Sequence, residues 1–370
     1  MSAEPIPLVD LHAQYRQLRP KVIASLLDVL DDMHLYLGPQ QKGFEREFAD
    51  FCGAAHGVSV CDGTEALTIA LRACGVGPGC EVITTAHSFM ATVEAIANTG
   101  ATPIFADIDP VTYTLDWRQL ESLVTDCTKA IIPVHIYGHP AEMDPIMDFA
   151  RKYELSVVED ASQAHGATYK GRKVGSIGDV GCFSLYCSKN LGAYGEAGVC
   201  VTNDATLAEK MAVLRDHGSR VRYEHNMMGV NGRMDEMQAA ILRVKLPHLD
   251  DWNERRRAHA AYYSERLRDV VSDVPAVAPD AGHVFHLYVV RVANRDALRE
   301  ALQAEGIGTG IHYPIPLHLQ PACARYEYTA GAFPVVESIA QQIISLPMYP
   351  EITQAQLDRV IAAVERHAEK

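Results

Sequence analysis

Long apolar runs are missing from this chain of 370 residues. No stretch reaches the roughly 18 consecutive apolar residues that a membrane-spanning helix needs. The opening sequence MSAEPIPLVDLHAQ lacks the basic start and the apolar core of a secretory signal peptide. We therefore expect a cytoplasmic protein with no membrane segment.

Positive charge is also scarce. The chain has 33 Lys and Arg residues against 47 Asp and Glu residues, which gives a formal net charge of -14. Such a charge repels nucleic acid and anionic membrane surfaces, so the sequence predicts neither as a partner. An anionic ligand would need a local basic site.

Several catalytic signatures are absent. The 9 cysteines include no CxxC pair and the 16 histidines include no HExxH, so we predict no metal site. Cys182 and Cys187 follow His165 closely enough to be considered as nucleophiles, but Cys182 lies in an apolar run typical of a buried strand, and we expect reduced core thiols. No GxxxxGK[ST] occurs, which removes support for a nucleoside-triphosphate motor.

Short apolar runs alternate with segments of helical spacing. The runs cover residues 57–62, 81–86, 102–108, 130–138, 155–160 and 180–186. This rhythm predicts an α/β fold with a mostly parallel central sheet and helices on both faces. The pattern restarts beyond about residue 260, with an apolar run at 283–292 and a helix after Thr353. We expect a large domain over residues 1–250 and a smaller C-terminal α+β domain over 251–370.

Polar residues follow two of the predicted strands. In open α/β sheets, ligands bind beyond the carboxyl ends of the strands. Gly63 and Thr64 come after the run GVSVC and open a helix, whose free N–H groups suit a phosphate. Asp160 ends the run LSVVED, and Gln163 can reach the same ligand. Each of these residues could also be an ordinary cap or turn residue.

A lysine stands in an unusual setting between two further apolar runs. Lys189 follows Ser184 and precedes a segment punctuated by glycines, whereas most lysines are solvated surface charges. A lysine with a lowered pKa forms Schiff bases. Phe89, at another strand end, could stack on a flat ring or belong to the core. A phosphate cradle, a stacking ring, an acid and a carbonyl-capturing lysine together fit pyridoxal 5'-phosphate.

Three motifs carry a resemblance to a known family: EDASQAHGA, FSLYCSKNLGAYGEAG and GVNGRMDEMQAAILRVKL. The chain resembles the nucleotide-sugar aminotransferases of the DegT/DnrJ/EryC1/StrS family, within the fold-type I pyridoxal-phosphate enzymes. The resemblance implies that Lys189 forms the Schiff base with the cofactor and that Asp160 pairs with the pyridine nitrogen. It also implies that Gln163 contacts the phenolic oxygen of the ring and that Phe89 stacks on it.

The resemblance extends to phosphate, subunit and sugar contacts. The positions that match its phosphate-binding residues are Gly63, Thr64 and Ser184. Asn231 matches an asparagine that the neighbouring subunit sends to the cofactor phosphate, so we expect a homodimer with shared active sites. His312 and Tyr313 open the segment HYPIPLH, which resembles the loop that meets the sugar.

The activity implied by the resemblance is transfer of an amino group from L-glutamate to a nucleotide-linked keto sugar. The segments HLYVVR, IHYPIPLHLQPA and RDHGSRVRYEHN are most similar to the 3-amino branch, which favours a dTDP-linked 3-keto-6-deoxyhexose as substrate. A diphosphate needs local cations, and we expect Arg220, Arg222 and His312 to supply them.

Other substrates and another class of function stay open. A 4-keto sugar, a UDP-linked 3-keto sugar and a keto-inositol are alternative acceptors. Relatives that dehydrate sugars carry histidine at the lysine position, and the presence of Lys189 argues against that activity. A cofactor-binding regulatory protein without turnover is the alternative of another class, although the acidic chain lacks a basic DNA-binding stripe.

Overall fold

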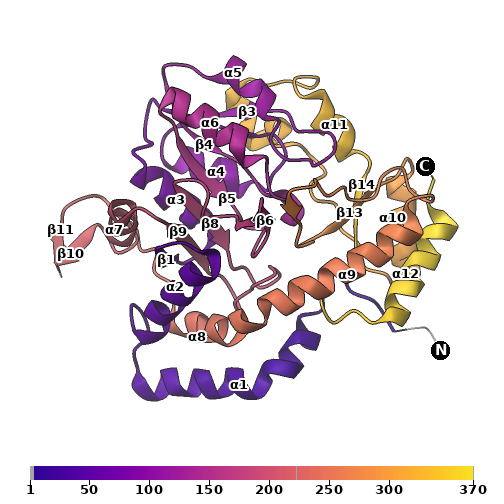
Figure 1. Cartoon of the computed structure of the whole chain (residues 1–370), viewed down its shortest axis with the longest axis horizontal. Coiled ribbons are helices and arrows are strands. Elements are labelled where there is room, and N and C mark those ends of the chain that lie inside the picture. Colours follow the sequence, from indigo (N-terminus) through magenta and orange to yellow (C-terminus); the bar gives the residue numbers. More distant parts are fainter. Residues whose placement is uncertain (1–3, 222, 370) are drawn as a thin grey trace.

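The centre of the molecule is a seven-stranded sheet with the strand order β1-β9-β8-β5-β4-β2-β3 (Figure 1). The structure is a computed structural model that describes residues 4–221 and 223–369. The strands of this sheet are β1 (His56–Val60), β2 (Glu81–Thr85), β3 (Thr102–Ala106), β4 (Thr128–Ile132), β5 (Ser156–Asp160), β8 (Val180–Ser184) and β9 (Gly198–Thr202). Only β9 runs against its neighbours in this sheet, so the predicted mostly parallel sheet is confirmed.

Helices cover both faces of the sheet because its strands are apolar on both sides. Consecutive residues of β5 point to opposite faces: Val157 belongs to one buried cluster and Val158 to the other. The first cluster also takes residues of α1 (Leu11–Asp32), α2 (Pro39–Cys52), α6 (Met143–Tyr153) and α8 (Glu236–Lys245). The second takes residues of α3 (Gly63–Ala73), α4 (Ala91–Asn98) and α7 (Ala205–Leu214).

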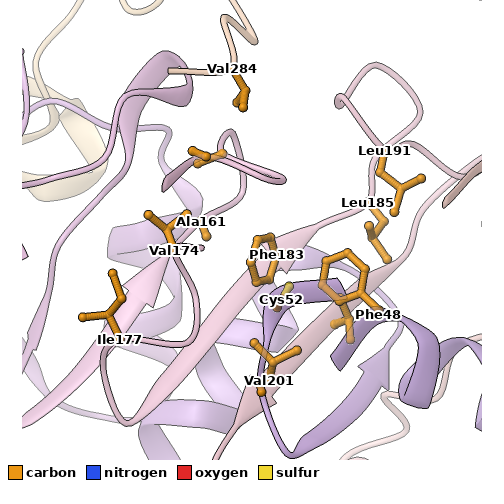
Figure 2. Close-up of a cluster of buried hydrophobic side chains, with 14 of the residues drawn as sticks. Phe48, Cys52, Ala161, Val174, Ile177, Phe183, Leu185, Leu191, Val201 and Val284 are labelled. Atoms are coloured by element: carbon orange, nitrogen blue, oxygen red, sulfur yellow. The ribbon is translucent and has the colours of Figure 1, made fainter. Parts of the chain in front are cut away.

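Aromatic packing fixes α2 against the sheet. Phe48 of α2 meets Phe183 of β8 edge to face, with ring centroids 5.0 Å apart, and Val201 of β9 lies in the same cluster (Figure 2). The spacing of Phe44, Phe48 and Phe51 predicts one apolar face of a helix. Phe44 and Phe48 are fully buried there, so that prediction is confirmed.

Two predicted apolar runs form shorter strands than expected. The run at 130–138 ends as a strand at Ile132, because Pro133 has no N–H to donate to the ladder. The chain then turns, and the backbone of Tyr137 bonds to two other segments. Its N–H donates to the side-chain oxygen of Gln163, and its carbonyl accepts the N–H of Leu287. In the run at 283–292 only Tyr288–Arg291 forms a strand, β13. Residues 283–287 instead lie along the turn at 136–138.

The C-terminal part has its own buried cluster. Helix α9 (Leu249–Leu267) runs from beside α8 to this part of the molecule (Figure 1), where β13 pairs with β14 (Ile343–Leu346). Helices α10 (Arg295–Ala304) and α12 (Gln354–His367) pack there, and Ile6 from the start of the chain joins them. The predicted boundary at 250/251 falls inside α9, and the division into two domains stays a prediction.

The remaining elements are short and peripheral to the sheet. They are α5 (Leu120–Leu123), α11 (Pro334–Ala340), β6 (Thr168–Tyr169), β7 (Arg172–Lys173), β10 (Ser219–Val221), β11 (Glu224–His225) and β12 (Ala281–Gly282). The β10–β11 hairpin projects from the body of the molecule beyond α7 (Figure 1). Over residues 4–221 and 223–369, no helix has both the length and the apolar character needed to cross a membrane.

Candidate active site

A cavity of about 880 Å³ opens at the carboxyl ends of the parallel strands. This is the edge where ligands of open α/β sheets bind. Its lining includes nine residues that the sequence singled out: Gly63, Thr64, Phe89, Asp160, Gln163, Ser184, Lys189, His312 and Tyr313. Residues far apart in the sequence therefore meet in a single site.

The N-terminus of α3 forms one wall of the cavity. Asp62 caps the helix by accepting the N–H of Glu65 at 2.8 Å. Gly63 allows a close approach, because a Cβ added there would lie 2.5 Å from Cβ of Ser184 at the end of β8. In the part of the chain that the structure describes, no hydrogen bond occupies the N–H of Gly63 or Thr64. Free N–H groups at a helix N-terminus, with a serine hydroxyl beside them, form an anion site.

Asp160 is held at the end of β5 by two donors. Its Oδ2 accepts from Thr92 Oγ1 at 2.9 Å, and its Oδ1 accepts from the N–H of Ser162 at 3.2 Å. The side chain is 5% exposed. A carboxylate fixed in this way can pair with a cationic ring nitrogen of a ligand.

The preceding residue fixes the strand end from the other face of the sheet. Glu159 is fully buried and accepts from the ring of His135 at 2.9 Å and from three backbone N–H groups at residues 175, 177 and 178. Burial alone raises the pKa of Glu159, but the hydrogen bond from His135 and the backbone donors outweigh it and hold the pKa below its usual range.

Lys189 brings an amine into the cavity. Burial lowers the pKa of Lys189 from 10.5 to about 8, although the negative charge of Asp160 opposes that shift. With a pKa of about 8, about a tenth of the amine is neutral at pH 7, far more than for a solvated lysine, and the neutral amine is the nucleophile that condenses with a carbonyl. The expectation that Lys189 departs from a solvated surface charge is confirmed.

Phe89, Gln163 and Tyr313 form a connected group on the cavity wall. Gln163 accepts the N–H of Tyr137 at 2.7 Å and donates to the hydroxyl of Tyr313 at 3.1 Å. The rings of Phe89 and Tyr313 lie with centroids 5.7 Å apart. Phe89 is 55% exposed, so the alternative that it is a core aromatic is wrong. An exposed ring beside a cavity is available to stack on a flat ligand.

His312 is present at the site but does not carry the charge expected of it. Its Nδ1 hydrogen-bonds to Ser345 Oγ at 2.8 Å, and its backbone carbonyl accepts from the hydroxyl of Tyr137. Burial and, to a smaller extent, the positive charge of Lys189 lower the pKa of His312 to about 4. The ring is therefore neutral at pH 7, which corrects the expectation that it supplies a cation for a diphosphate.

Two other predicted residues, Asn231 and Arg220, do not line this cavity in the same chain. Asn231 is exposed and pairs with Asp216 in an isolated bridge. Arg220, on β10, forms an ion pair with Glu209 at 2.8 Å. Arg222 lies outside the described residues. The subunit-crossing role of Asn231 and the diphosphate role of the two arginines stay predictions.

Several lining residues were not identified from the sequence as site residues. They are Ser88, Thr92, Tyr186, Glu196 and His286. Thr92 and His286 carry no local signal, because their roles come from contacts with residues 68 and 96 positions away. Tyr186 and Glu196 lie inside the motif FSLYCSKNLGAYGEAG around Lys189, and that position was the available signal for both.

The comparisons with known proteins agree with this geometry. The sequence model of the DegT/DnrJ/EryC1/StrS aminotransferase family matches residues 16–365. The chain belongs to this family. Its expected fold, a fold-type I transferase that depends on pyridoxal phosphate, is confirmed, and the protein is a pyridoxal-phosphate-dependent aminotransferase.

Individual relatives of the aminotransferase are similar over nearly its whole length. The dTDP-3-amino-3,4,6-trideoxy-alpha-D-glucose transaminase of Streptomyces venezuelae is 46% identical over 99% of this chain and 97% of its own length. The crystal structure of DesV from S. venezuelae in complex with a ketimine intermediate has a TM-score of 0.96 and 46% identity, covering 98% of each chain. A "pleiotropic regulatory protein" of Geobacillus stearothermophilus is 47% identical over 97% of each chain.

The cavity of the aminotransferase fits pyridoxal phosphate. The α3 N-terminus with Ser184 suits the phosphate, and the Gly63 position leaves room that a Cβ would fill. The Asp160 carboxylate suits the pyridine nitrogen, and the Lys189 amine suits the aldehyde. When bound, the cofactor supplies an electron sink for the electrons of a substrate C–H bond.

Proposed function

We propose that this aminotransferase moves an amino group from L-glutamate to a nucleotide-linked keto sugar, a dTDP-linked 3-keto-6-deoxyhexose that becomes the 3-amino sugar. The observation that carries the proposal is the 46% identity, over almost the whole of both chains, to a relative named as a transaminase of a dTDP-3-amino sugar. The cavity of about 880 Å³ is large enough for a cofactor together with part of such a substrate.

In this proposal each of the cavity residues Asp160, Lys189, Gln163 and Phe89 has a separate role. Asp160, fixed in position by its two hydrogen-bond donors, would pair with the pyridine nitrogen of the cofactor. Lys189 would hold the aldehyde of the cofactor and, as a free amine, would serve as the general base and acid for the proton at the substrate carbon. Gln163 and Phe89, which both line the cavity, would contact the cofactor ring by a hydrogen bond and by stacking. The same residues serve both half-reactions.

A second copy of the chain completes the site in this proposal. Asn231 is exposed and free to contact a neighbouring subunit, as the family resemblance implies. Apolar side chains on α1 and the turn after it are exposed as well, among them Leu27 at 53% and Met33 at 69%. Exposed apolar residues grouped in this way are typical of a protein interface.

The proposed substrate is tested by a screen with glutamate as donor. The purified enzyme is offered a dTDP-linked 3-keto-6-deoxyhexose, a 4-keto isomer, a UDP-linked 3-keto sugar and a keto-inositol, and products are identified by mass spectrometry. We expect the highest kcat/KM with the dTDP-linked 3-keto sugar. Efficient turnover of the keto-inositol with none of the nucleotide sugars would overturn the substrate class.

A regulatory protein without turnover is the second candidate function. It is favoured by the name of the Geobacillus relative, which is 47% identical to this chain. A binding protein has no need of a lysine with a lowered pKa and a fixed carboxylate in one cavity, and both are present here. The same screen separates the candidates: a protein that binds pyridoxal phosphate but forms no product with any acceptor supports the regulatory one.

A further inference from the structure

His286 lines the cavity but has no part in the chemistry derived above. It lies in the segment 283–287 that runs along the turn at 136–138, and it is 7% exposed. Its Nδ1 is 3.1 Å from Oδ1 of Asn190, the residue after Lys189. Asn190 is buried and is not among the residues that line the cavity.

A chain of hydrogen bonds fixes which atom of Asn190 faces the ring. Asn253 donates from Nδ2 to the backbone carbonyl of His165 at 2.8 Å, so its Oδ1 is left to accept. Asn190 donates from Nδ2 to that Oδ1 at 2.9 Å and to the carbonyl of Val284 at 3.1 Å. Because backbone carbonyls only accept, neither amide can be turned round without losing bonds. Asn190 must therefore present its oxygen to His286.

This arrangement determines the tautomer of His286. The Nδ1 atom donates to Asn190 Oδ1 and so carries a proton. Burial, together with the charges of Lys189 and Arg256, lowers the pKa of His286 well below 6.5, so the ring is neutral at pH 7. In a neutral ring protonated at Nδ1, Nε2 has a free lone pair. No hydrogen bond to this Nε2 is found in residues 4–221 and 223–369.

The free lone pair on Nε2 of the neutral His286 ring restricts which ligand groups can bind beside it. It repels a carboxylate or a phosphate, and it accepts a hydrogen bond from a hydroxyl group. Glutamate presents two carboxylates, and its one strong donor, the ammonium group, is the group that reacts, whereas a sugar presents ring hydroxyls. We propose that His286 Nε2 accepts a hydrogen bond from a ring hydroxyl next to the reacting carbon of the sugar, and so acts in the sugar half-reaction only. This inference rests on the proposed function.

The kinetic test uses His286→Phe, which keeps a ring of similar size but removes the acceptor. We expect KM for the nucleotide sugar to rise about tenfold, as for the loss of one hydrogen bond, with kcat within about twofold of wild type. The glutamate half-reaction, followed by cofactor absorbance, should be unchanged within about twofold. His286→Phe also leaves Oδ1 of Asn190 without its donor. His286→Gln shares that loss but can place an amide oxygen near the Nε2 position, so we expect this second variant to recover part of the KM.

A matched control comes from the same segment. His283 is also buried, but its Nδ1 accepts the N–H of Phe285 at 2.9 Å and it does not line the active-site cavity. In His283→Asn the amide oxygen can keep that bond, and we expect the KM of the sugar to stay at the wild-type value.

Deoxy substrates and NMR decide the outcome. The KM of wild type and of His286→Phe is measured with a 2-deoxy and a 4-deoxy analogue of the sugar. One of these analogues lacks the hydroxyl that His286 binds, and with that analogue the two proteins should have the same KM. An unchanged KM in His286→Phe with the full sugar overturns the inference, as does a ¹⁵N spectrum, assigned by difference with His286→Gln, in which Nε2 carries the proton. Failure of wild type to turn over any nucleotide sugar would overturn the proposed function instead, while the NMR result would still decide the tautomer.

Discussion

A comparison of Lys189 with Lys245 shows that a lowered pKa and a position in the cavity are separate requirements for a reactive lysine. Burial lowers the pKa of both, to about 8 for Lys189 and to about 7 for Lys245. Only Lys189 lines the cavity, whereas the amine of Lys245 donates to the carbonyl of Gly192. A lowered pKa makes a lysine reactive only where a carbonyl compound can reach it.

We expect borohydride reduction of the cofactor-loaded protein to label Lys189 and to leave Lys245 unlabelled, as read by peptide mass spectrometry. Since the pKa is lowered, the neutral amine becomes the main form above pH about 8 instead of above about 10.5. Cofactor-free protein should therefore combine with pyridoxal phosphate faster as the pH rises toward about 8 and level off above it. A reduced adduct on another lysine, or activity in Lys189→Ala, would contradict the assignment.

Asp160 is expected to act through its charge. In Asp160→Asn the Thr92 contact can persist while the negative charge is lost, so the cofactor should still bind and kcat should fall at least about a hundredfold, the scale of a lost electrostatic stabilisation. Stopped-flow absorbance measures the rate per bound cofactor.

The control for Asp160 is Asp107→Asn. Asp107 is an equally buried aspartate just beyond the end of β3, where it accepts the N–H groups of Val335 and Val336. It does not line the cavity, so Asp107→Asn should lower the melting temperature and leave the rate within about twofold. Near-normal activity of Asp160→Asn would mean that another acid holds the pyridine nitrogen.

At the scale of elements, the start of α3 and the end of β8 form the phosphate cradle by close approach. A Cβ on Gly63 would lie 2.5 Å from Cβ of Ser184, a separation that needs backbone movement. Gly63→Ala should therefore push α3 from β8 and weaken the binding of pyridoxal phosphate about tenfold or more, as measured by fluorescence titration of the cofactor-free protein.

Gly77 provides a matched glycine for this prediction. Nothing lies within 4 Å of the Cβ that Gly77→Ala would add, and its backbone is not in the left-handed region. Gly77→Ala should bind the cofactor as wild type does. Equal cofactor affinity of Gly63→Ala and Gly77→Ala would show that the close contact between α3 and β8 has no part in the cradle.

For the whole molecule, we expect a homodimer that buries the apolar side of α1. Leu27 and Leu30 are 53% and 44% exposed on this helix. Two glutamates in Leu27→Glu/Leu30→Glu would be desolvated at the interface, so the variant should be a monomer in sedimentation velocity and should lose most of its activity. The single variant Val277→Glu, at a residue 46% exposed elsewhere, should remain a dimer. A fully active monomer would refute the shared site.

Local patterns alone were enough to predict the parallel sheet, the helices on its faces and most of the catalytic lining. Asp160, Gly63 and Thr64 stand where apolar strands end, and the ends of parallel strands meet at one edge whatever the details of packing. The family motifs added the roles that we expect for Lys189 and Gln163.

Burial and long-range contacts required the tertiary structure. The neutral state of His312, the exposure of Phe89 and the tautomer of His286 depend on residues distant in the chain that remove water or fix a hydrogen-bond partner. Sequence position gives the identity of a side chain, but its charge and its free lone pairs depend on solvent access and on neighbouring dipoles. Packing alone brings His286 of the segment before β13 beside Asn190, 96 residues earlier in the chain.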